Sequence, residues 1–112
     1  MRIVIASLLL LALGACATAS LRTYSGVYVV GQDMTALYSY DGGDPYWVSA
    51  DPDVQQAMQA PIPQPFDPGA TARVIVEVQG VESPPGIYGH LGAYTRELHV
   101  TRVVSARLQG VT

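Results

Sequence analysis

A single short helical pattern, bracketed by prolines, interrupts a chain that is otherwise typical of β-strands. Asp51 can cap the helix, and Pro52 suits its first position because the missing N–H would have no partner there. Pro61 ends the pattern because proline cannot continue a helix. The apolar residues in between follow helical spacing and predict one narrow stripe, made of Val54, Ala57 and Met58. The rest of the fold must therefore be built from strands on either side of this helix.

Three runs rich in β-branched and aromatic residues precede the helix. The first covers residues 24–30, the second covers residues 35–40, and the third begins at Tyr46. A strong turn signal separates the last two runs, because the two glycines of Asp41–Pro45 permit positive φ and the proline blocks strand pairing. Gly26 lies inside the first run and is a candidate for a β-bulge.

Two further strands follow the helix, after a proline-rich stretch at residues 60–69. We expect that stretch to be an extended surface connector, with a recognition surface as the alternative. Valines at every second position of residues 73–79 predict one buried and one wet face. The inward positions of residues 97–108 are predicted to be Leu98, Val100, Val104, Ala106 and Leu108. Arg102 breaks this pattern; it lies either at the barrel mouth or beside a bulge, which we favour because it turns Val103 inward.

Three strands, a helix and two strands are the element order of the OB-fold, a small five-stranded Greek-key barrel. We therefore predict an all-β, OB-like barrel over residues 22–112, with one short helix between strands three and four. An irregular β-sandwich would have the same order of elements. Closure suits so small a domain because it removes exposed sheet edges, and the chain's single cysteine excludes an internal disulfide.

The amino-terminal segment is typical of a secretory signal. Its apolar run is too short to span a bilayer, which takes about 20 apolar residues. The end of this run, Leu13–Cys16, resembles the bacterial lipobox, in which the cysteine sulfur receives diacylglycerol and the new amino terminus is acylated, typically with palmitate. We expect a signal peptide over residues 1–15, a lipidated Cys16 and a tether over residues 16–21.

An ordinary secretory signal is the alternative, because the small residues around Cys16 also fit the small-x-small cleavage pattern. In lipoproteins an Asp after the cysteine commonly retains the protein at the inner membrane. Ala17 stands at that position here, so the resemblance implies a lipid anchor at the periplasmic face of the outer membrane.

The segment between the last two strands has the most unusual composition. It contains three glycines, two tyrosines and one histidine in the run Tyr88-Gly-His-Leu-Gly-Ala-Tyr-Thr-Arg-Glu-Leu98 and the two residues before it. This run resembles a group of small bacterial envelope proteins of unassigned function, which are similar to the OB-like domain of NlpE-type outer-membrane lipoproteins. The resemblance spans about residues 24–107 and implies no chemistry. NlpE-type domains often carry a cysteine pair that is missing here, so redox sensing is not carried over.

The same segment is the candidate ligand site, because the loop between strands four and five borders the usual ligand face of an OB barrel. A small polar and aromatic pocket is predicted from Tyr88, His90, Tyr94 and Arg96. Arg96 would meet an anionic group and a tyrosine would stack on a ring. The alternative is a glycine-bent hairpin whose tyrosines only cover the barrel end.

Metal, cofactor and catalytic sites are not expected. His90 and His99 have no ligand spacing around them, and no nucleophile motif is present. Asp41 and Asp44 flank a Gly-Gly turn and are interpreted as turn residues. The chain contains six arginines and no lysine against nine acidic residues, which disfavours nucleic-acid binding.

We therefore expect a non-enzymatic binding module, held to the membrane through Cys16, whose partner is an envelope protein or a glycan. Two alternatives remain open. One is a small-molecule binding module that uses the loop at residues 86–96. The other is an inhibitor of a secreted hydrolase such as lysozyme, which would present a protruding loop at residues 41–44 or 86–94.

Overall fold

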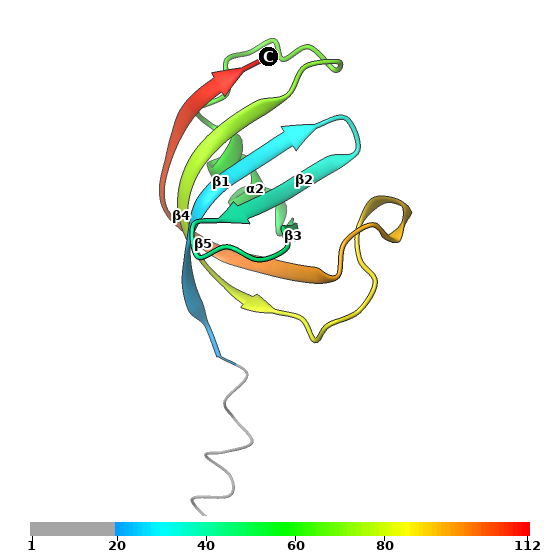
Figure 1. Ribbon diagram of the computed structural model, residues 1–112. Helices are drawn as coiled ribbons and strands as arrows, with labels where there is room; N and C mark the ends of the chain where they lie inside the picture. Colours follow the sequence, from blue (N-terminus) through cyan, green and yellow to red (C-terminus); the bar gives the residue numbers. More distant parts are fainter. Residues whose placement is uncertain (1–19) are drawn as a thin grey trace, which may run out of the picture.

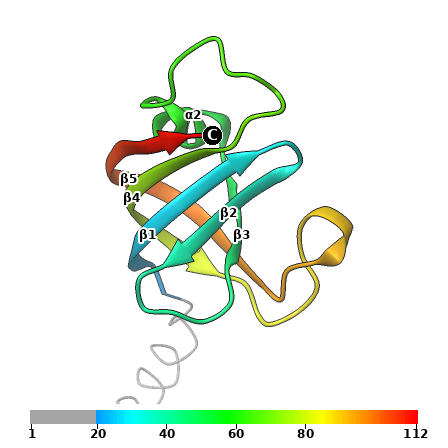
Figure 2. The same ribbon diagram turned by 45° about the horizontal axis from the view of Figure 1, so that its top comes forward.

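The computed structural model describes residues 20–112, in which five strands close into a barrel and one helix crosses its end (Figures 1 and 2). The elements are β1 (Arg22–Gly31), β2 (Met34–Ser39), β3 (Tyr46–Ala50), α2 (Pro52–Gln59), β4 (Ala72–Glu82), the 3₁₀ turn η1 (His90–Gly92) and β5 (Arg96–Val111). The strand order around the barrel is β1-β2-β3-β5-β4, and only the β3–β5 pair is parallel. The prediction of an OB-like barrel is confirmed, and the sandwich alternative is not formed.

The predicted signal peptide (1–15), the lipidated Cys16 and most of the tether lie outside the described residues. The described chain begins at Ser20, and β1 starts at Arg22. The start of β1 and the end of β5 lie at opposite ends of the barrel (Figure 1). No helix within residues 20–112 is long and apolar enough to cross a membrane.

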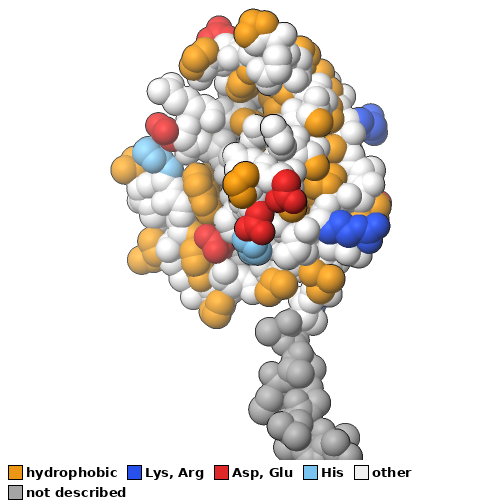
Figure 3. All heavy atoms as spheres, turned by 180° about the vertical axis from the view of Figure 1, so that it is seen from behind, with side chains coloured by type: hydrophobic (Ala, Val, Ile, Leu, Met, Phe, Trp, Pro, Cys, Tyr) orange, Lys and Arg blue, Asp and Glu red, His pale blue; other side chains and the backbone are white. Residues whose placement is uncertain are grey.

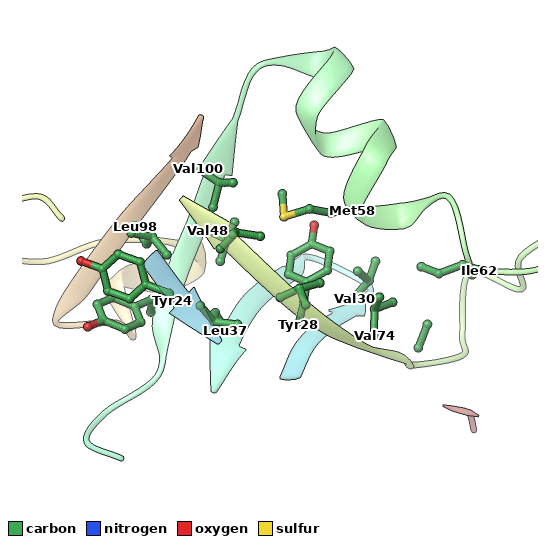
Figure 4. Close-up of a cluster of buried hydrophobic side chains, with 14 residues drawn as sticks. Tyr24, Tyr28, Val30, Leu37, Val48, Met58, Ile62, Val74, Leu98 and Val100 are labelled. Carbon is green, nitrogen blue, oxygen red and sulfur yellow. The ribbon is translucent and has the colours of Figure 1, made fainter. Parts of the chain in front are cut away.

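The barrel interior is filled by alternate residues of every strand. In β4 each second residue is buried, including Val74, Val76 and Val78, so the predicted two-faced strand is confirmed. Figure 4 shows this interior extending from Tyr24 and Leu98 at one end to Ile62 at the other. The buried side chains form one cluster: Tyr24, Tyr28, Val30, Leu37, Tyr46, Val48, Met58, Ile62, Ala72, Val74, Val76, Val78, Leu98 and Val100.

The helix covers one barrel end through Met58, which is 1% exposed and points toward Tyr28 (Figure 4). The Gln59 side-chain amide donates a hydrogen bond to the Tyr28 hydroxyl at 3.2 Å, which satisfies this buried polar group. Two expectations for the helix were wrong. Ala57 is exposed, and of the predicted stripe only Met58 is buried while Val54 packs partly against the core. Asp51 occupies the N-cap position, but its side chain makes no capping hydrogen bond.

The proline-rich stretch is not the extended connector that we predicted. It leaves the sheet as expected, but it runs as a series of turns and packs onto the barrel end. Ile62 is only 4% exposed, and Phe66 packs partly against the core. The reason is apolar burial, because these two side chains lose contact with water when they pack against the core beside the helix.

β5 pairs with the shorter strand β4, and bulges take up the extra residues of β5. Arg102 pairs with Gln79 and Val100 pairs with Gly80, so Thr101 is an extra residue in β5. Val103 packs against the core as a result, which confirms the bulge predicted near Arg102. Val104 is the next extra residue of β5, because Val103 pairs with Val78 and Ser105 pairs with Glu77. Its side chain points outward and is 45% exposed. The prediction that Val104 points inward was therefore wrong.

Gly26 does not form the predicted bulge. It pairs in unbroken register with Ser39 on one side and Val76 on the other. A Cβ at this position would lie 2.2 Å from the backbone oxygen of Tyr38. Glycine is needed here because two backbones approach closely, not because the strand has gained a residue.

Candidate binding site

The outer face of β1, β2 and β3 carries two cross-strand rows of apolar and aromatic side chains. Strand alternation places them outward, because their neighbours in sequence fill the interior. The first row is Val29, Ala36 and Trp47, and the second row, which begins on β4, is Ile75, Val27 and Tyr38. Val29 and Ala36 are buried although neither belongs to the interior cluster. The outer face of these strands therefore carries a contiguous group of apolar side chains, which is a common property of binding surfaces.

The loop between β4 and β5 packs on this face through Trp47. The rings of Trp47 and Tyr94 lie 5.3 Å apart with a tilt of 56°. Gly89 has φ of 76°, and a Cβ there would lie 2.5 Å from the Trp47 ring, so the loop backbone itself touches the indole. Burial, with the nearby Tyr38 hydroxyl as a smaller cause, raises the pKa of Tyr94. We call Tyr38, Trp47 and Tyr94 the aromatic platform.

A pocket of about 400 Å³ opens beside the platform, between the β2–β3 loop and the β4–β5 loop. We call it the Tyr94 pocket. Its lining combines one carboxylate, one hydroxyl, one aromatic ring and two apolar side chains, supplied by Asp44, Pro45, Ala93, Tyr94 and Thr95. The Thr95 hydroxyl donates a hydrogen bond to Asp44 Oδ2 at 3.2 Å and so joins the two loops.

Arg96 lies at the base of the β4–β5 loop, where its guanidinium group contacts other residues of the protein. Its guanidinium carbon lies 3.9 Å from the centre of the Tyr46 ring, a cation–π contact. One of its terminal N–H groups donates a hydrogen bond to the backbone oxygen of Asp44. The guanidinium also lies against Gly43, where an added Cβ would be 3.2 Å away. Arg96 therefore positions the β2–β3 loop, and it does not line the Tyr94 pocket.

Tyr88 and His90, the other two members of the predicted pocket, point elsewhere. The Tyr88 and Tyr94 backbones exchange two hydrogen bonds, of 2.8 and 3.1 Å, which close the loop. The Tyr88 hydroxyl donates to the backbone oxygen of Pro84. His90 is exposed in η1 at the loop tip. Of the four residues predicted to share a pocket, only Tyr94 lines the one found beside the loop.

The barrel end next to this loop is closed by a polar cluster. The hydroxyls of Tyr24 and Tyr46 both donate hydrogen bonds to Glu82 Oε1, at 3.0 and 2.6 Å. The two rings meet edge to face at 5.6 Å. Burial, followed by the hydrogen bond to Glu82, raises the pKa of each tyrosine to about 12. We call Tyr24, Tyr46, Glu82 and Arg96 the tyrosine cluster.

Charged side chains are distributed unevenly. On the face drawn in Figure 3, the arginines lie at one edge, whereas acidic side chains lie toward the middle and the opposite side. The His99 ring forms a hydrogen bond with the Ser49 hydroxyl, 3.0 Å from Nδ1. Within residues 20–112, no three of the His, Asp and Glu side chains converge in a way that could hold a metal ion.

Comparisons of the chain with protein-family models, with curated proteins and with solved structures found no match. The resemblance to NlpE-type lipoproteins stays a prediction.

Sequence reasoning missed Tyr38, Trp47 and Asp44 as site residues. The signal was present in the order of elements, because the strands numbered two and three of an OB barrel carry its ligand face. Their outward positions follow from alternation once Leu37 and Tyr46 are assigned to the interior.

Proposed function

We propose that this protein is a lipid-anchored, non-enzymatic binding module at the periplasmic face of the outer membrane, and that it binds a glycan strand. The observation that supports this best is the aromatic platform: Tyr38, Trp47 and Tyr94 gather on the outside of β2 and β3, beside the β4–β5 loop. That surface is where OB barrels bind oligonucleotides and oligosaccharides.

The chemistry of the platform suits a sugar chain. Sugar rings offer apolar C–H faces to aromatic side chains and hydroxyl groups to a few polar partners, and ligand sites generally combine the two. Tyr38 is 48% exposed and has a ring free to stack. Asp44 and Thr95, at the edge of the platform, supply a carboxylate and a hydroxyl. The volume of the Tyr94 pocket, about 400 Å³, is in the range of small-ligand pockets.

Charge favours a glycan over a nucleic acid. Binding of single-stranded nucleic acid needs a positively charged groove along the backbone as well as stacking aromatics. The chain has a net charge of −3 and no lysine. Glu97 of β5 pairs with Trp47 of β3, and Asp44 lies beside Tyr94 in the pocket lining. The platform therefore has a carboxylate at each edge. A phosphate backbone would be repelled there.

The membrane anchor in this proposal rests on the lipobox-like Leu13–Cys16. Five residues lie between Cys16 and the start of β1 at Arg22, and a chain of that length reaches at most about 20 Å from one to the other. A lipid on Cys16 would hold the barrel near the bilayer surface. Mass spectrometry of the amino-terminal peptide from membranes tests this step: a diacylglyceryl, acylated Cys16 is expected, and a Cys16→Ser form should leave the membrane fraction. An unmodified Cys16 in the mature protein overturns the anchor.

Titration of the purified full chain with soluble oligosaccharides tests the glycan step. The detergent must lack a sugar head group. Tyr38→Ala and Tyr94→Ala should each weaken binding by up to about tenfold, since a lost aromatic contact costs up to about 1.5 kcal/mol and about 1.4 kcal/mol corresponds to tenfold. Tyr40→Ala is the matched control, because Tyr40 is 63% exposed but lies outside the platform. If no oligosaccharide binds, or if the Tyr40 variant loses as much affinity, the platform is not a glycan site.

A second candidate function is inhibition of a secreted hydrolase, and one observation favours it. The β4–β5 loop projects from the barrel (Figures 1 and 2), and its tip exposes 81% of Ile87 and 89% of Leu91 beside His90. A protruding loop with apolar tips and internal hydrogen bonds is preorganised for insertion into a cleft. If this is the function, the protein should slow lysozyme at stoichiometric amounts, and Leu91→Ala should restore the rate. Unchanged lysozyme turnover removes this candidate.

A further inference from the structure

We propose that the Tyr94 pocket is a subsite for the N-acetyl group of an amino sugar. The inference rests on the proposed glycan function and names the sugar class that this site takes. An acetamido group has three features that a site can recognise: an N–H donor, an apolar methyl group and a flat amide. The pocket offers a counterpart to each.

The donor partner is the Asp44 carboxylate. Oδ2 accepts the hydrogen bond from Thr95 at 3.2 Å, and within residues 20–112 the structure gives Oδ1 no donor. The residue is held on both sides, because its backbone oxygen accepts from Arg96 and Pro45 fixes the chain that follows. A carboxylate that is already positioned loses little entropy when it accepts an N–H from a ligand.

The methyl partner is the apolar part of the lining. Pro45 and Ala93 contribute small apolar surfaces from the two facing loops, and Tyr94 contributes a ring. A plain hexose would place a hydroxyl against these groups and leave them in contact with water. The acetamido methyl instead removes apolar surface from water, which is favourable by about 25 cal/mol for each Å² buried.

The surrounding charges argue against the other common sugar classes. An anionic sugar would bring its carboxylate or sulfate toward Asp44 and be repelled. A free amino sugar would pair with Asp44, but its charged ammonium group would lose water against the apolar side chains of Pro45 and Ala93. Of the four classes, only the N-acetylated one satisfies both the carboxylate and the apolar lining.

The test is a titration of the full chain, in a detergent without a sugar head group, with three β-1,4-linked tetrasaccharides of equal length. They are the tetramers of N-acetylglucosamine, of glucose and of glucosamine. We expect the N-acetylated tetramer to bind about tenfold more tightly than the other two, the effect of one satisfied hydrogen bond with a buried methyl group. Equal binding of all three overturns this inference and leaves the glycan function standing. Absence of binding by any of them overturns both.

Two variants assign the preference to the pocket. Asp44→Ala removes the acceptor altogether and should remove most of the preference for the N-acetylated tetramer, whereas Asp41→Ala, in the same loop but outside the pocket lining, should keep it. Ala93→Leu tests the site independently of Asp44, because Ala93 is exposed and a larger side chain there fills the pocket without reaching the core. It should abolish the preference while the thermal midpoint stays unchanged. A preference that survives both Asp44→Ala and Ala93→Leu contradicts the assignment.

Discussion

The two ends of the barrel are closed by different chemistry, and the difference separates stability from function. At the helix end, Met58, Ile62 and Phe66 pack on the interior, and the main polar contact there is the Gln59–Tyr28 hydrogen bond. At the other end, the tyrosine cluster joins four strands, β1, β3, β4 and β5, through hydrogen bonds to Glu82 and a cation–π contact. The first end is held by buried apolar area, and the second by the geometry of a few polar groups.

This difference indicates which substitutions should change binding at the site and which should change stability alone. Arg96 belongs to the tyrosine cluster and also holds the Asp44 backbone, so the polar end is connected to the Tyr94 pocket through one side chain. Nothing comparable connects the helix end to the platform among the described contacts. Changes at the helix end should therefore alter stability alone, whereas changes near the polar end and its loop should alter binding as well.

The largest effect is expected from Met58→Ala at the helix end. Met58 is 1% exposed, and truncating a buried methionine leaves a cavity that costs about 2–5 kcal/mol of the free energy of unfolding. Urea denaturation measures this loss, and oligosaccharide affinity should not change for the folded fraction. Gln56→Ala is the control, because Gln56 is exposed on the same helix. A change in affinity equal to that of a platform variant would show that the two ends are not independent.

Gly89→Ala should weaken binding, which Met58→Ala does not, and should cost less stability, about 1–3 kcal/mol for a non-glycine residue held in this backbone conformation. The residue has φ of 76°, and its new Cβ would lie 2.5 Å from Trp47, so the loop must move off the indole. We expect oligosaccharide affinity to fall about tenfold, as for loss of an aromatic contact. Trp47 is the only tryptophan, so its emission should shift to longer wavelength as water reaches the ring.

Gly69→Ala is the matched control for this loop substitution. Gly69 also lies in a loop, but its nearest neighbour to an added Cβ is the Asp67 side chain at 3.6 Å, an ordinary contact. The Gly69→Ala variant should keep the tryptophan emission spectrum and the oligosaccharide affinity of the unsubstituted protein. Unchanged emission in Gly89→Ala would mean that the loop does not need glycine to pack on Trp47.

The barrel could be predicted from the sequence because its rules are local and repeated. Alternating valines in β4, one helix bracketed by Pro52 and Pro61, and a Gly-Gly turn each determine an element by themselves. Even the bulge near Arg102 followed from one polar residue in an apolar row. The second bulge, at Val104, could not be predicted, because no residue type marks it. It depends on how far β5 must curve around β4.

The site was predicted only in part because its contacts join segments far apart in the chain. The β4–β5 loop was identified from its glycines and tyrosines, and Tyr94 does line the pocket beside it. Arg96 was assigned to a ligand, yet its guanidinium stacks on Tyr46, fifty residues earlier in the chain. No local pattern distinguishes an arginine that binds a ligand from one that positions a loop. The register of the parallel β3–β5 pair makes that distinction.

Alkaline pH should weaken the polar end through the two tyrosines that donate hydrogen bonds to Glu82. The pKa values of Tyr24 and Tyr46 are raised to about 12 in the folded protein, against 10.0 for the free side chain. A raised pKa means that the folded state holds the proton longer, so the stabilisation is complete below pH 10 and is lost as pH rises toward 12. Urea midpoints measured between pH 8 and 12 should fall through that window. The decline should be shallower in Tyr24→Phe/Tyr46→Phe, but not in Tyr40→Phe, where an exposed tyrosine is replaced.

The smallest effect is expected at the loop tip, where Leu91 has φ of 58°. This left-handed conformation costs a leucine about 1 kcal/mol, and asparagine tolerates it better. Because Leu91 is 89% exposed, Leu91→Asn loses no packing and should raise the free energy of unfolding by up to about 1 kcal/mol. Asp33→Leu is the reciprocal control: Asp33 has the same φ in the β1–β2 turn and should lose a similar amount.

The same variant decides what the loop tip is for. If glycan binding is the sole function, Leu91→Asn should be more stable and bind oligosaccharides as before, since Leu91 does not line the Tyr94 pocket. If the tip enters a hydrolase, the gain in stability should be accompanied by loss of inhibition, because a polar side chain replaces the apolar one that the cleft would bury. A stabilised variant that keeps both activities would show that the strained leucine serves neither, and the comparison between the two barrel ends would then not extend to the tip of the loop.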